Sequence, residues 1–167
     1  MNILLFTDNT GLSSSPQLDH FVGYKVPGST VTIDAVALRT AASAESEIAA
    51  AVAAGSYDVC VLLVGTNDDD TDAKALAQQI RKTAKKGKTS STGVVICATL
   101  GENGAAVTAQ LNRLNNNPSY AIVDIRDAFF TEGYDDNDGG FDASAPDENW
   151  PNSDGIDKIA DAIAGAL

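Results

Sequence analysis

The chain has 167 residues and a mass of 17.2 kDa, which suits one domain over residues 1–167 with a core of its own. Its 23 acidic and 11 basic residues give a net charge of −12, which argues against binding to nucleic acid or to an anionic membrane. No apolar run approaches the roughly 18 residues of a membrane span, and the first residues lack the pattern of a signal peptide. We therefore expect a soluble globular domain.

The predicted elements alternate between strand and helix along the chain. Short apolar runs predict five buried strands, and amphipathic or Ala-rich segments predict five helices. We expect Ser43 to cap the second helix and Gly55 to end it. An acidic, Gly-rich stretch over 131–149 has no period and predicts a loop. In chain order the elements are strand 2–6, helix 16–24, strand 30–38, helix 43–54, strand 57–64, helix 72–86, strand 93–98, helix 105–115, strand 120–125 and helix 152–167.

This order of elements predicts the fold class. Continuous apolar strands separated by helices are typical of a parallel sheet that is covered on both faces. Right-handed crossovers then give an α/β fold, a three-layer α/β/α sandwich with a five-stranded parallel sheet and flavodoxin-like topology. Ligands of such sheets bind at the carboxyl ends of the strands. The segments 7–11, 38–40 and 65–68 follow predicted strands and are therefore the candidate site.

The loop Gly65-Thr66-Asn67-Asp68 directly follows the third predicted strand, and by itself it is also typical of a tight turn before a helix. The chain has Thr7-Asp8-Asn9 after its first strand and Asp147-Glu148-Asn149-Trp150 before its last helix. Together these boxes resemble the SGNH hydrolases, also called the GDSL lipase/esterase family. That family has a Gly-Asp-Ser box after strand one and a Gly after strand two. A Gly-x-Asn-Asp box follows its strand three, and an Asp-x-x-His box precedes its last helix.

The resemblance implies where the family's catalytic groups would lie. Asn9 stands at the position of the nucleophilic serine, and an amide has no useful nucleophilicity. Trp150 stands at the position of the general-base histidine, and an indole N–H can only donate. Thr40 falls at the second-box Gly, Asn67 at the oxyanion-hole Asn, and Asp147 at the Asp that pairs with the histidine. We therefore predict an inactive protein in which these five positions are relics.

A hydrolase fold without its nucleophile and base predicts a binding or structural role. Acidic chains rich in small residues are similar to bacteriophage virion proteins, some of which use this fold. We expect a structural or assembly protein whose partner is a protein, such as a viral capsid that it decorates, or a second copy of itself. It would be located in the virion, or in the cytoplasm if the protein is not viral. We expect no cofactor, no metal, no nucleic acid and no membrane.

Two alternatives remain open. A carbohydrate-binding module could use the relict pocket, with the ring of Trp150 stacked on a sugar, and an unconventional esterase could use an unseen nucleophile. As binding residues we select Asp8, Asn67, Asp68 and Trp150. His20, the only histidine, is expected to be an exposed or half-buried helix residue.

Other patterns have simpler interpretations. Residues 10–13 resemble the phosphate loop of flavodoxins, but the nearby Asp8 would repel a phosphate. Residues 135–142 are acidic, but no register supplies the ligand spacing of a calcium loop. Cys60 and Cys97 lie in apolar runs and are expected to be buried free thiols.

A basic cluster accounts for five of the eleven basic residues: Arg81, Lys82, Lys85, Lys86 and Lys88. Cations at the end of a helix stabilise the negative end of its dipole, which is the simpler interpretation. A docking patch for an acidic partner is the alternative.

Overall fold

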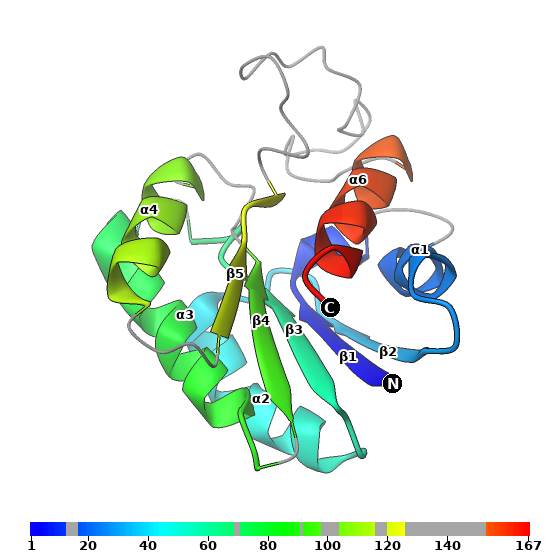
Figure 1. The fold of residues 1–167 in the computed structure, drawn as a ribbon. Helices are drawn as coiled ribbons and strands as arrows, with labels where there is room; N and C mark the ends of the chain where they lie inside the picture. Colours follow the sequence, from blue (N-terminus) through cyan, green and yellow to red (C-terminus); the bar gives the residue numbers. More distant parts are fainter. Residues whose placement is uncertain (13–16, 69–70, 91, 98–103, 116–119, 126–152) are drawn as a thin grey trace.

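Five parallel strands form one sheet in the order β2-β1-β3-β4-β5, with helices on both faces (Figure 1). The computed structural model describes residues 1–12, 17–68, 71–90, 92–97, 104–115, 120–125 and 153–167. The predicted α/β sandwich with a five-stranded parallel sheet is therefore confirmed. The strands are β1 (Asn2–Thr7), β2 (Thr30–Ala35), β3 (Val59–Leu63), β4 (Gly93–Cys97) and β5 (Tyr120–Val123).

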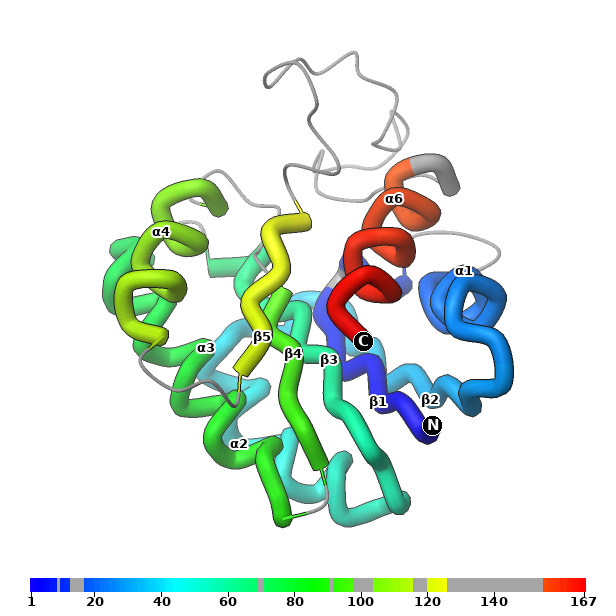
Figure 2. The backbone as a smooth tube through the Cα atoms, in the orientation of Figure 1, coloured from blue at the N-terminus to red at the C-terminus, as the bar shows by residue number. Residues whose placement is uncertain are grey.

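The helices cover the sheet in two groups (Figure 1). Helices α2, α3 and α4 pack on one face, and α1 and α6 lie side by side on the other (Figure 2). Lys25 links α1 to α6, because its Nζ lies 2.8 Å from Asp157 and 2.7 Å from Asp161. The helices are α1 (Leu18–Lys25), α2 (Ala41–Ala53), α3 (Ala73–Gly87), α4 (Gly104–Leu114) and α6 (Ser153–Ala164), and a 3-10 turn η1 covers Asn9–Gly11.

Each central strand is buried on both faces, which explains its continuous apolar sequence. In β1, Leu4 and Phe6 belong to the core under α2, α3 and α4, whereas Ile3 and Leu5 belong to the core under α1 and α6. The alternation follows from the two-residue period of a strand. Because β1 and β3 pair in parallel, their carboxyl ends lie next to each other at the same edge of the sheet.

Two predicted boundaries were wrong near that edge. Strand β2 ends at Ala35 rather than at residue 38, because the chain turns at Leu38, whose φ is 59°. Helix α2 is capped by Thr40 rather than by Ser43. Ser43 is the third residue of the helix and closes a capping box, in which its backbone N–H donates to Thr40 Oγ1 at 3.2 Å. Helix α2 ends at Ala53, just before the expected stop.

The cysteine prediction is confirmed. Cys60 and Cys97 are free and have no solvent exposure. Burial raises the pKa of each thiol to about 12, so both stay protonated at neutral pH. His20 is exposed on α1, where its ring edge faces Phe21 at a centroid distance of 6.0 Å.

Within the residues described, no helix combines the length and the apolar character that crossing a membrane requires. In the same part of the chain, no cluster of three or more His, Cys, Asp or Glu side chains could hold a metal ion. The loop expected over 131–149 lies outside the described residues.

Candidate functional site

The carboxyl ends of β1 and β3 meet at a buried carboxylate. Asp8 follows β1, and its backbone N–H donates to the carbonyl of Leu63 in β3 at 3.1 Å. Its side chain has no solvent exposure. Oδ1 accepts from the backbone N–H of Thr10 at 3.1 Å and from Thr10 Oγ1 at 2.9 Å. Oδ2 accepts from the backbone N–H of Thr66 at 3.0 Å. The carboxylate therefore ties the η1 turn to the loop after β3.

Burial and hydrogen bonding act on Asp8 in opposite directions. Desolvation raises the pKa of the carboxyl above its ordinary value, and the hydrogen bonds from Thr10 and Thr66 lower it less. Both oxygens are occupied by groups of the chain itself. Asp8 thus holds the two loops of the site together through its hydrogen bonds to Thr10 and Thr66. A direct contact between Asp8 and a ligand stays a prediction.

The loop after β3 also holds the start of α2. Asn67 Nδ2 donates to the carbonyl of Arg39 at 3.0 Å, and Asp68 Oδ2 accepts from the backbone N–H of Ala41 at 2.9 Å. Asp68 is half-buried, and desolvation raises the pKa of its carboxyl. The structure therefore brings Asn67 and Asp68 against the segment that contains Thr40.

The backbone N–H of Thr40 is occupied by the capping box of α2. It donates to Ser43 Oγ at 3.1 Å, and Ser43 Oγ donates in turn to the Thr40 carbonyl at 3.0 Å. At two of the positions where the resemblance places oxyanion-hole donors, Thr40 and Asn67, the chain supplies the acceptor itself.

Three of the five positions that the resemblance singles out are described only in part or not at all. Asn9 begins the η1 turn, and its side chain is outside the description. Asp147 and Trp150 lie outside the described residues.

Sequence reasoning missed Arg39, whose side chain makes several contacts at this edge. Its side chain is 2% exposed. Nη1 donates to the carbonyls of Thr7 at 2.7 Å and Asp34 at 2.8 Å, Nη2 binds Asp34 Oδ1 at 2.7 Å, and Nε binds Glu47 Oε2 at 3.0 Å. The group also lies 3.9 Å above the ring of Phe6. One arginine thus joins the ends of β1 and β2 to α2. The sequence held one signal for this role. Arg39 is the one basic residue in the connection between the predicted strand 30–38 and the predicted helix 43–54, both of which contain acidic residues.

Gly11 is required by the close approach of η1 to β1. A Cβ at this position would collide with Thr7 Oγ1 and lie 3.1 Å from the Cβ of Ala35. We expect Gly11→Ala to lower the free energy of unfolding by about 2 kcal/mol in urea, because Thr7 is fully buried and both neighbours lie at the ends of paired strands. Gly23→Ala on α1 is the matched control, since its Cβ would meet only Val31 at 3.7 Å. Equal stability of the two variants would contradict this assignment.

Solved structures share this fold. A lipolytic protein of the G-D-S-L family from Desulfitobacterium hafniense matches with a TM-score of 0.77 at 13% identity, over 99% of each chain. A second G-D-S-L protein, from Veillonella parvula, matches with a TM-score of 0.76 at 15% identity, over 100% of this chain and 98% of that one. The chain has the SGNH-hydrolase fold. The lipase/acylhydrolase from Enterococcus faecalis matches with a TM-score of 0.72 at 15% identity, over 98% and 93%.

No protein-family model matches the sequence, and no curated protein does. The likeness at these identities concerns the SGNH fold, and the roles assigned to single positions rest on the sequence boxes and on the contacts above.

Proposed function

We propose that this SGNH-fold chain is not a hydrolase and that it serves as a binding or assembly protein. The observation that carries the proposal is the hydrogen bonding of Thr40 and Asn67 to Ser43 Oγ and to the Arg39 carbonyl. An oxyanion hole works through donors that are aimed at the position where negative charge develops. The Thr40 N–H and one of the two Nδ2 hydrogens of Asn67 bind the chain's own oxygens, which supports a role without catalysis.

The residue types at the other relict positions support the same proposal. The nucleophile position holds Asn9 and the base position holds Trp150. His20, the alternative base, is exposed on α1, where its ring makes a T-shaped contact with Phe21. Loss of either the nucleophile or the base removes most of the rate of a triad enzyme, because the members act as a unit.

The partner that we propose is a protein assembly, with a viral capsid as the first setting to examine. Support comes from composition: the chain is small, strongly acidic and poor in large side chains, with one Met and one Trp. The same net charge of −12 disfavours nucleic acid and anionic membranes as partners. Assembly with further copies of the chain belongs to this proposal.

An esterase is the second candidate, because the structural neighbours are named as lipolytic proteins and an acylhydrolase. It would need a nucleophile other than residue 9. Thr10 Oγ1 has a carboxylate partner, since it donates to Asp8 at 2.9 Å, but Thr10 has no solvent exposure. Thr7 has none either, and its Oγ1 donates to the Asp8 carbonyl at 3.2 Å. Burial of both hydroxyls disfavours this candidate.

Hydrolysis of p-nitrophenyl butyrate tests the proposal. We expect the wild type to show only the background rate, with no change in Asn67→Ala. The triple variant Asn9→Ser, Thr40→Gly, Trp150→His should gain weak turnover, because it restores the nucleophile and base and removes the Thr40 side chain that caps α2. Asn112→Ala, an exposed position on α4, is the control. Wild-type turnover that is lost in Asn67→Ala and kept in Asn112→Ala would overturn the proposal in favour of the esterase.

A further inference from the structure

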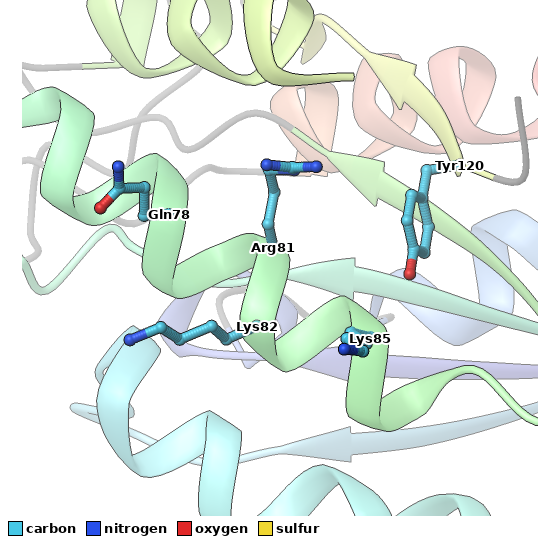
Figure 3. Close-up of a pocket in the computed structure, with 5 residues that line it drawn as sticks. All are labelled: Gln78, Arg81, Lys82, Lys85 and Tyr120. Atoms are coloured by element: carbon cyan, nitrogen blue, oxygen red, sulfur yellow. The ribbon is translucent and has the colours of Figure 1, made fainter. Parts of the chain in front are cut away.

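A second site candidate lies on α3, away from the edge that holds Asp8. Gln78, Arg81, Lys82 and Lys85 line an open groove of about 490 Å³ together with Tyr120 (Figure 3). The helix residues recur at the spacing that places side chains on one stripe of a helix. Tyr120 begins β5, so its end of the groove lies at the amino-terminal edge of the sheet.

The helix dipole does not account for all of these cations. The last turn of α3 contains Lys85 and Lys86, whereas Arg81 and Lys82 precede it. Lys86 forms an ion pair with Glu45 at 2.9 Å. Among the described residues, no carboxylate lies within ion-pair distance of the three cations that line the groove.

The side chains that line the groove differ in type from one end to the other. In Figure 3, Gln78 and Lys82 lie toward one end, and Arg81 and Lys85 lie between them and Tyr120. The ammonium of Lys88 lies 5.5 Å from the centre of the Tyr120 ring, which adds positive charge at this end. The groove therefore combines a cationic centre with an aromatic ring at one end and a side-chain amide at the other.

The charge of the whole chain limits what the groove can accept. Outside the three cations that line the groove, the chain carries all 23 acids and eight of the 11 bases. At physiological salt the Debye length is about 8 Å, so an anion inside the groove interacts mainly with the local cations. An acidic protein surface or a long polyanion would extend beyond the groove and meet the acidic remainder. A compact anion is therefore favoured over an extended one.

We propose that this groove binds a small sugar that carries a phosphate or sulfate ester. The planar guanidinium of Arg81 can make paired hydrogen bonds to a tetrahedral oxyanion, and Lys82 and Lys85 add point charges. With the oxyanion on these cations, the sugar would lie at the Tyr120 end of the groove, where the part of the ring that lines the groove can contact it. The Gln78 amide, at the other end, can donate to an oxygen of the ester group. A groove of about 490 Å³ lies in the size range of small-molecule sites.

Amide NMR titration of the full chain at low ionic strength tests this site, with glucose 6-phosphate, glucose 6-sulfate, inorganic phosphate and glucose as probes. We expect one or both esters to shift the signals of residues 78–85 and Tyr120, and to bind at least about tenfold more tightly than glucose. Binding by one ester alone would identify the oxyanion. Added salt of about 200 mM should weaken binding several-fold, because the contacts are ionic.

Charge-removing variants make the test specific. Arg81→Gln should weaken binding of the preferred ester about tenfold, and Lys85→Gln, at an exposed position, should weaken it several-fold. Lys158→Gln removes the same charge from α6, on the other face of the sheet, and should leave binding unchanged. The proposal is overturned if glucose or inorganic phosphate binds as tightly as the esters, or if Arg81→Gln binds them as the wild type does.

Discussion

Arg39→Met is expected to lower the free energy of unfolding by about 3 kcal/mol, measured by urea denaturation followed by circular dichroism. Methionine preserves much of the length and apolar surface of the side chain but has no donors. The carbonyls of Thr7 and Asp34 would each lose a hydrogen bond of less than 3 Å. The carboxylates of Asp34 and Glu47 would lose the cation between them. Because Arg39 is almost fully buried, water cannot fully replace these contacts.

Two further variants separate charge from geometry at this position. Arg39→Lys keeps the charge but cannot make the forked contacts of a guanidinium, so we expect a loss between those of the wild type and Arg39→Met. Arg113→Met, on the exposed side of α4, is the matched control and should change stability by less than about 0.5 kcal/mol. If Arg39→Met were no more damaging than Arg113→Met, the guanidinium would not hold the two strand ends to α2.

The layers of the fold could be predicted from the sequence because a strand that is buried on both faces has an uninterrupted apolar sequence. Runs such as Ile3–Phe6 and Cys60–Val64 are apolar at every position, and each is buried at every position. A helix between consecutive runs then leaves only parallel pairing with crossover connections. These are local consequences of hydrophobic burial, and they need no knowledge of distant contacts.

The start of α2 was predicted less well because distant contacts decide it. Thr40 and Ser43 are both good capping residues, and sequence pattern does not choose between them. In the structure, Asp68 accepts from the backbone N–H of Ala41, which fixes the first turn three residues earlier than expected. Leu38 adopts a positive φ that its residue type does not signal.

The candidate site was also predicted only in part: its loops were placed correctly, but their contacts were not. The loops that contain Asp8, Thr40 and Asn67 were predicted to meet, since each follows a strand of the parallel sheet. Their hydrogen-bond partners were not predicted. Arg39 finds its acceptors on three segments that are separate in sequence, and only the folded sheet brings them together. The assignments of Asp147 and Trp150 stay predictions.

Asp8→Ala is expected to be the most damaging single change, with a loss of about 4 kcal/mol in the free energy of unfolding. It would remove the acceptor that Asp8 supplies to the backbone N–H groups of Thr10 and Thr66 in a fully buried position. Asp8→Asn should cost less, because one amide oxygen can still accept, while its Nδ2 would face a donor. Asp19→Ala, a carboxylate on the first turn of α1, is the control and should cost less than about 1 kcal/mol. Equal losses in Asp8→Ala and Asp19→Ala would contradict a structural role for Asp8.

The loss in Asp8→Ala should also depend on pH. Burial raises the pKa of the Asp8 carboxyl above its ordinary value of 3.8, so the folded protein holds this proton more tightly than the unfolded chain does. The stability that comes from this proton is fully present below pH 3.8 and is lost as the pH rises through the raised pKa. The difference in unfolding free energy between wild type and Asp8→Ala should therefore narrow as the pH rises above 3.8. A difference that widens instead would mean that the hydrogen bonds from Thr10 and Thr66 outweigh desolvation, and that the carboxyl is held ionised.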